Sequence, residues 1–128
     1  MPESALGYWL KELRTDRDLS LRELAQLSEV DHAYIHRLET GAKEAPSADV
    51  VTKLVNALAP SERNTQVLRF LVGHPNVDVG LAQFVRADPN VTFDEFHMLT
   101  TVVNRGASAD YSTSLERIRR YMREDDDG

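Results

Sequence analysis

Four neighbouring side chains have the types and spacing to interact with the edge of a nucleic-acid base: His32, Ala33, His36 and Arg37. Positions i, i+1, i+4 and i+5 share one face of a helix, because residues four apart lie one turn apart. The planar fork of Arg37 can bind guanine or a phosphate through two hydrogen bonds. Either histidine can donate to or accept from a base edge, and Ala33 can contact a thymine methyl group. This segment is therefore predicted to read bases.

Simpler interpretations of the same side chains are open. Arg37 can pair with Glu39 or another nearby acid, and the other three can be surface side chains without a ligand. His32 and His36 have the i, i+4 spacing of a metal-binding pair, but no third ligand follows at a recognisable spacing. The chain has no cysteine, no glycine-rich phosphate loop and no HExxH motif. We therefore expect no metal, no cofactor and no enzymatic activity.

Two short helices joined by a tight turn, over residues 21–41, are expected to position these side chains. The apolar residues that must face each other are Leu21, Leu24 and Ala25 in the first helix and Val30, Ile35 and Leu38 in the second. Ala25 is small because the second helix crosses over it at close range. This spacing is that of a DNA-binding helix-turn-helix, whose second helix lies in the major groove of DNA.

Residues 6–59 resemble the Cro/C1-type (XRE-family) helix-turn-helix domain of phage and bacterial repressors. The match is carried by WLKELRTDRDLSLRELAQLSEVDHAYIHRLETG, from Trp9 to Gly41, and is extended by Pro46-Ser47, Leu54, Val55 and Leu58. The resemblance implies a five-helix, lambda-repressor-like fold and double-stranded DNA as the partner.

Three positions depart from the family's pattern. Leu21 stands where the family usually has a glutamine that contacts phosphate or supports a base-reading partner. Glu29 stands where the turn usually has glycine, so we expect a positive φ there at some energetic cost. The segment 41–47 is one residue longer than usual, so Lys43 need not occupy the family's position.

Contacts to the DNA backbone set the register of a protein on the duplex without reading its sequence. We expect this role for cations and hydroxyl groups around the two helices: Arg14, Arg17, Ser20, Arg22, Tyr34, Thr40, Lys43 and Ser47. Arg22 lies where a helix begins, and there the helix dipole also favours phosphate. Arg14 and Arg17 can equally form a solvated helix face, and Tyr34 borders the core, so its partial burial is expected.

Capping signals and apolar stripes predict an all-α chain of roughly eight helices. The expected N-caps are Ser4, Ser20, Asp31, Ser47, Ser61, Thr92 and Thr113, with a further helix near residues 78–87. Gly41 should end the third helix in the left-handed conformation. His74-Pro75-Asn76 is the expected boundary between a helix-turn-helix domain, residues 1–73, and a helical dimerisation or regulatory region with an acidic tail, residues 74–128.

The apolar residues after this boundary must be buried against something, and two arrangements are open. They can pack onto the first domain or form a homodimer interface. We favour the homodimer, because paired half-sites about 34 Å apart need two recognition helices. The expected dimer residues are Phe84, Val85, Phe93, Phe96, Leu99, Ile118 and Tyr121.

The run VTFDEFHMLTTVVNRG, followed by ERIRRYM, resembles the C-terminal region of repressors encoded beside ImmA/IrrE-type metalloproteases. In that family the partner protease cleaves the repressor, and several members act as antitoxins. Of the family's FRGRRP-like stretch this chain has only Asn104-Arg105-Gly106. An alternative function is therefore an antitoxin or interaction module that binds a toxin or a metalloprotease through residues 74–128.

Net charge argues for weak non-specific DNA binding. The 128-residue chain has a charge of −6, with seven Lys and Arg against ten Asp and Glu up to Pro60, and eight against eleven afterwards. Non-specific affinity is almost entirely electrostatic, so it should be low.

There is no run of 18 apolar residues and no secretory signal, so we expect a cytoplasmic protein outside the membrane. The expected function is that of a sequence-specific transcriptional regulator, a dimeric repressor acting on an inverted repeat near its own promoter.

Overall fold

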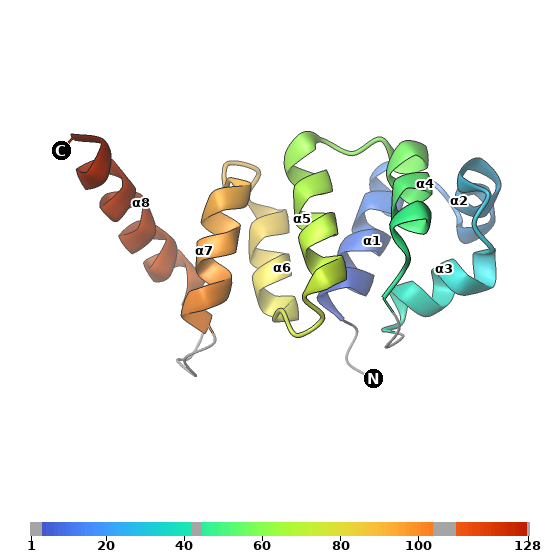
Figure 1. Cartoon of the computed structure of the whole chain (residues 1–128), viewed down its shortest axis with the longest axis horizontal. Coiled ribbons are helices and arrows are strands. Elements are labelled where there is room, and N and C mark those ends of the chain that lie inside the picture. Colours follow the sequence, from blue (N-terminus) through green and yellow to red (C-terminus); the bar gives the residue numbers. More distant parts are fainter. Residues whose placement is uncertain (1–3, 42–44, 104–109, 128) are drawn as a thin grey trace.

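The computed structural model describes residues 4–41, 45–103 and 110–127, and within them the chain forms eight α-helices and no β-strand (Figure 1). The helices are α1 (Ala5–Asp16), α2 (Leu21–Ser28), α3 (His32–Glu39), α4 (Ala48–Leu58), α5 (Glu62–Gly73), α6 (Val79–Ala87), α7 (Phe93–Val103) and α8 (Tyr111–Asp127). The prediction of an all-helical chain is thus confirmed for these residues.

Most of the predicted helix starts are confirmed by hydrogen bonds to backbone N–H groups that the helix leaves unpaired. The side chains that accept such a bond as predicted are Ser4, Ser20, Asp31, Ser47, Ser61 and Thr92. Glu23 and Glu95 complete two capping boxes by accepting from the backbone N–H of the cap residue. Gly41 follows the C-cap residue Thr40 of α3 and has a φ of 96°, the positive value expected there.

The start of α8 was predicted wrongly. The helix begins at Tyr111, two residues before the expected cap. Asp110 accepts hydrogen bonds from both the backbone N–H and the hydroxyl group of Thr113. The aspartate therefore caps α8, and Thr113 lies in its first turn. Tyr111, only 8% exposed, anchors this turn in the core.

Helix α1 is central to the hydrophobic core. It packs against α3, α5 and α6. Trp9 is fully buried, and its Nε1 donates a hydrogen bond to the backbone oxygen of Asn64, 3.1 Å away. Apart from Val51, the buried apolar residues of the described ranges form one cluster that runs from Ala5 to Ile118. Both halves of the chain therefore share the same core.

Arg63 of α5 ties the end of α6 to the first half of the chain. Its Nη1 donates to the backbone oxygens of Val85, Asp88 and Val91, at 3.0 to 3.1 Å. The guanidinium group also lies 5.9 Å from the ring centroid of Trp9. One side chain thus satisfies three carbonyl groups where α6 ends, a place where helices leave acceptors unpaired.

Arg86 of α6 makes a second connection across the predicted boundary. It forms ion pairs with Asp16 and Glu12, both on α1. Together with the shared core, these contacts join the residues before His74 to those after it. The division into two domains stays a prediction.

The apolar residues expected at a dimer interface are mostly buried within the chain itself. Val85, Phe96 and Leu99 are fully buried, and Ile118 is 7% exposed. Phe84 and Phe93 are half-buried, whereas Tyr121 is 64% exposed. The second half thus packs onto the first, which was the other arrangement left open. A homodimer stays a prediction, but the four buried side chains that were expected at its interface can contribute almost no surface to it.

The helices are arranged along one long axis, with α2 and α3 at one end and α8 at the other (Figure 1). Helix α7 packs against α5 and α6, and α8 packs against α7. No helix in the described ranges is long and apolar enough to cross a membrane. The predicted base-reading helix therefore lies far from the C-terminal end of the molecule.

Candidate nucleic-acid interface

Buried apolar side chains hold α2 and α3 together as the sequence predicted. Leu24 and Ile35 are fully buried, while Leu38 and Val30 are 2% and 7% exposed. Ala25 is half-buried beside them. This inner contact fixes which face of α3 points away from the protein.

The turn between α2 and α3 uses a left-handed residue, as predicted. Glu29 has a φ of 61° and donates its backbone N–H to the oxygen of Ala25, at 2.8 Å. A side chain other than glycine is strained there. Ser28 is buried, and its hydroxyl accepts a hydrogen bond from the backbone N–H of Val30. The turn is therefore closed on both sides by local hydrogen bonds.

The four predicted base-reading side chains are all exposed on the outer face of α3. They are His32, Ala33, His36 and Arg37. The guanidinium group of Arg37 lies 5.6 Å from the ring centroid of Tyr34, which is half-buried as expected. Among the described residues, no carboxylate forms an ion pair with Arg37. Its fork is thus held near an aromatic ring with its hydrogen-bond donors available.

Glu39 has a different partner from the one the sequence suggested. It binds Arg14 of α1 through two hydrogen bonds of 2.7 and 2.9 Å, and its side chain is only 5% exposed. Arg14 also donates to the backbone oxygen of Leu19. The hydrogen bonds that Arg14 donates to the Glu39 carboxylate raise the pKa of Arg14. Arg14 therefore anchors α3 to α1, and its three bonds leave it poorly suited to bind phosphate.

Helix α1 also approaches the end of α3 closely at Gly7. A Cβ atom at this position would lie 2.5 Å from the backbone oxygen of Glu39 and 2.7 Å from that of Leu38. Such contacts are shorter than van der Waals distances, so a side chain would push the two helices apart. The close approach and the Arg14 bridge together set the orientation of α3.

The remaining candidates for phosphate contact differ in whether their hydrogen-bond donors are already used within the protein. Arg17 and Arg22 are exposed, and Arg17 donates to the backbone oxygen of Leu58 at 3.2 Å. The Ser20 and Ser47 hydroxyl groups accept capping bonds but keep their own protons free to donate. The Thr40 hydroxyl already donates to backbone oxygens of α3, so it is a poorer donor to phosphate. Lys43 lies outside the described residues, as do Asn104, Arg105 and Gly106.

Comparison with known protein families identifies this arrangement. A family model described as a helix-turn-helix domain matches residues 5–68, which is half of the chain. The chain belongs to the helix-turn-helix domain family. No curated protein and no solved structure is similar enough to count as a match.

The helix-turn-helix domain has few positive charges where DNA would bind. On α2, α3 and their turn, the exposed cations are Arg22 and Arg37, against the exposed acids Glu23, Glu29 and Asp31. Glu23 stays ionised, because the hydrogen bonds that it and Ser20 exchange lower its pKa. The outer face of the domain therefore offers little general attraction for a polyanion.

One exposed side chain of the helix-turn-helix domain was not anticipated. Leu27 on α2 is 59% exposed, although leucine is usually buried. Leu27 lies outside the apolar stripe by which α2 contacts the core, and this position in the sequence could have predicted its exposure. A lone exposed leucine is common on protein surfaces, so we assign it no role.

Proposed function

We propose that this protein is a sequence-specific transcriptional repressor that binds an inverted repeat near its own promoter as a homodimer. The observation that carries the proposal is the outer face of α3. Four side chains suited to base contact are exposed there, and the Arg37 fork has no carboxylate partner in the described residues. In a helix-turn-helix protein, this face enters the major groove.

The scarcity of positive charge on the interface supports a specific mode of binding. With few cations to neutralise phosphates, affinity for arbitrary DNA should be low. Base contacts by Arg37 and the two histidines must then supply much of the binding energy. Arg22 at the start of α2, together with the Ser20 and Ser47 hydroxyl groups, would set the register on the backbone.

The test is fluorescence anisotropy with DNA from immediately upstream of the gene, against a scrambled competitor, at two salt concentrations. Arg37→Ala should weaken specific binding by about 1–3 kcal/mol, because a bidentate contact to guanine contributes that much. Arg69→Ala on α5 is the matched control, since it removes an equally exposed arginine far along the chain from α3. An equal loss for both variants would contradict base reading by Arg37.

The homodimer would form at a groove between α7 and α8. This groove, of about 220 Å³, is lined by Met98, Ser114, Arg117, Ile118 and Tyr121. Tyr121 and Leu27 are the exposed large apolar side chains of the described residues. A second copy covering Tyr121 would remove this side chain from water, and tyrosine is enriched at the energetic centres of interfaces.

Sedimentation equilibrium tests the dimer. Tyr121→Ser should weaken self-association about tenfold or more, because truncating a central interface tyrosine typically costs over 1 kcal/mol. Leu27→Ser is the control, since Leu27 is comparably exposed but belongs to α2 at the other end of the molecule. A monomeric wild-type protein at micromolar concentration would contradict the dimer.

The acidic interface and the exposed groove also favour a second candidate function. The protein would be an antitoxin or interaction module whose α7/α8 groove binds a toxin or a metalloprotease. Weak binding that is alike for specific and scrambled DNA, combined with tight binding of a protein from a neighbouring gene, would support this function over the repressor.

A further inference from the structure

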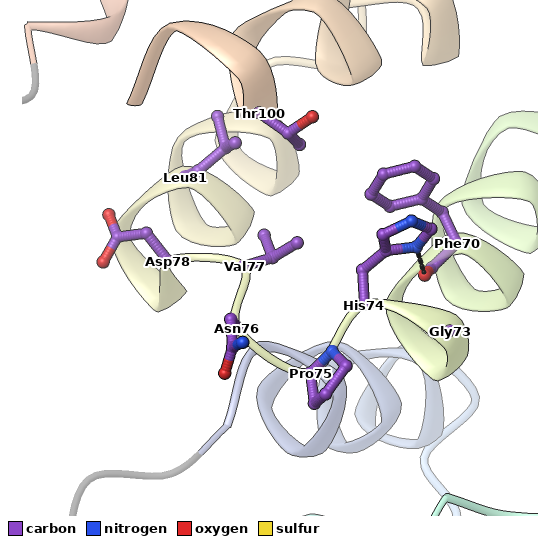
Figure 2. A pocket seen from close by; sticks show the side chains of 9 residues that line it. All are labelled: Phe70, Gly73, His74, Pro75, Asn76, Val77, Asp78, Leu81 and Thr100. Atoms are coloured by element: carbon purple, nitrogen blue, oxygen red, sulfur yellow. Dashed lines mark hydrogen bonds between the residues drawn. The ribbon is translucent and has the colours of Figure 1, made fainter. Parts of the chain in front are cut away.

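A cavity of about 350 Å³ opens between the end of α5, the start of α6 and the last turn of α7. Phe70 and His74 form one wall, Val77 and Leu81 lie across from them, and Thr100 lies above (Figure 2). Its volume falls within the range of small-molecule sites, about 300–1,000 Å³. None of these residues takes part in the proposed DNA contact.

The wall of the cavity is a preformed aromatic surface. The rings of Phe70 and His74 are stacked, with centroids 3.9 Å apart and planes within 5° of parallel. A hydrogen bond of 2.8 Å between Nδ1 of His74 and the backbone oxygen of Phe70 holds the imidazole in place. Aromatic rings attract further planar rings by stacking or edge contacts. The cavity therefore suits a flat ligand.

Apart from the Asn76 amide, which can both donate and accept, the polar side chains of the cavity offer mainly hydrogen-bond acceptors. A carbonyl oxygen can only accept, so Nδ1 of His74 carries the proton and Nε2 of the neutral ring is an acceptor. The Thr100 hydroxyl donates to the backbone oxygen of His97, which leaves its lone pairs to accept. Asp78, at the edge of the cavity, accepts from Tyr111 and is also an acceptor. The cavity has no lysine or arginine in its lining.

We propose that this cavity binds a small planar aromatic molecule that carries N–H donors and no negative charge. The ligand should be flat because the stacked rings of Phe70 and His74 form one wall, and it should carry N–H donors because most polar side chains of the cavity are acceptors. It should carry no negative charge because the lining has no lysine or arginine. Gly73 marks the open side, because a Cβ atom added there would meet no atom within 4 Å. The site is additional to the DNA-binding face and does not depend on the proposed function.

The probe is 2-aminobenzimidazole, added to the ¹⁵N-labelled full chain without DNA and followed by amide chemical shifts. We expect saturable shifts around Gly73, Val77 and Thr100 with a Kd of about 1 mM or below, as for a well-placed fragment of this size. Naphthalene-2-carboxylate, a flat anion without N–H donors, and cyclohexylamine, a donor without a flat ring, should shift these amides at least fivefold less at equal concentration. Equal shifts from either compound, or none from the probe, would overturn the proposal.

Two variants and one matched control assign the binding to this cavity. His74→Ala should raise the Kd about fivefold by removing a stacking ring, and Gly73→Leu should abolish binding by filling the open side. His97→Ala is the control: its ring is 5.2 Å from that of Phe70 but lies outside the cavity lining. A Kd unchanged by His74→Ala and Gly73→Leu would place the probe elsewhere and overturn the proposal. Because no DNA is present, failure of operator binding leaves this result unaffected.

Discussion

The turn between α2 and α3 contains a residue under backbone strain. Glu29 is exposed and adopts the left-handed conformation, which costs most residues about 1 kcal/mol or more. Glu29→Gly should therefore raise the free energy of unfolding by about 0.5–1 kcal/mol, after the larger chain entropy of unfolded glycine is deducted. Urea denaturation measures this change.

A matched substitution separates backbone strain from charge at this position. Glu29→Ala also removes the carboxylate but keeps a Cβ atom, so it should give no comparable gain. If alanine stabilised the protein as much as glycine, the effect would come from charge, and strain at Glu29 would be refuted.

At the scale of single residues, the sequence predicted what local geometry decides. Positions within two turns of a helix are enough to predict the positive φ of Glu29, the caps at Ser20 and Asp31, and the exposure of Arg37. The Arg14–Glu39 pair joins residues 25 positions apart, and nothing in their local spacing marks it. For Glu39 the sequence consequently suggested only Arg37, two positions away, as a partner, and only as an alternative to DNA contact by Arg37.

At the scale of helices, α7 and α8 are joined by a pH-sensitive contact. Glu95 accepts hydrogen bonds from Arg119 at 2.9 and 3.3 Å, and its side chain is 10% exposed. Burial raises the pKa of Glu95, but the bonds from Arg119 and Thr92 outweigh burial and lower it below its ordinary value of 4.5. A lowered pKa means that the folded state favours the ionised carboxylate more than the unfolded state does.

Removing this carboxylate should reduce the stability of the protein in a pH-dependent way. The contribution of Glu95 is present above pH 4.5 and is lost as the pH falls through its lower folded-state pKa. Glu95→Gln should therefore cost about 1 kcal/mol at pH 7, a modest figure because Arg119 is 40% exposed, and progressively less as the pH falls below 4.5. Urea denaturation at pH 7, 5 and 3 checks this.

Asp94, exposed on the same turn of α7, provides the control for this pH dependence. In the described residues the Asp94 carboxylate makes no hydrogen bond or ion pair to α8, so Asp94→Asn should leave the α7–α8 contact and its pH dependence intact. A cost of Glu95→Gln that stays constant from pH 7 to pH 3 would rule out the ionised pair.

Helix boundaries were predicted best where one short motif decides them. The Thr92 and Glu95 box starts α7 because both of its hydrogen bonds lie within four residues. The same type of motif at Thr113 misplaced the start of α8. There Asp110 provides the stronger acceptor, and Tyr111 is buried, so the helix begins three residues earlier than predicted. Burial is a tertiary effect that the local motif does not contain.

At the scale of the whole molecule, the shared core predicts cooperative unfolding. Trp9 is the only tryptophan and reports on α1, whereas far-ultraviolet circular dichroism reports on all helices. Because α1 packs against both α3 and α6, the two signals should give the same urea midpoint. A loss of circular dichroism at clearly lower urea than the change in Trp9 fluorescence would show that residues 74–128 unfold separately.

The sequence could not predict whether residues 74–128 pack onto the rest of the chain or onto a second copy. Val85, Phe96 and Leu99 have the apolar spacing of a buried face, and that spacing is the same whether the covering surface belongs to this chain or to a second copy. The contacts of α6 with α1 and of α7 with α5 distinguish the two. Tyr121, by contrast, is left uncovered and keeps the dimer proposal open to test.

Because α3 and α8 lie at opposite ends of the molecule, a small rotation at α8 would cause a large displacement of α3. From α3 the chain of packed helices runs through α1, α5 and α7 to α8, and four steps of 8–10 Å span roughly 32–40 Å. Two copies joined at α8 and fully extended would hold their α3 helices roughly 60–80 Å apart, about two turns of DNA. A small change of the angle between the two copies would then move each α3 by several base pairs. The two half-sites would therefore need to lie on the same face of the double helix, but their exact spacing could vary.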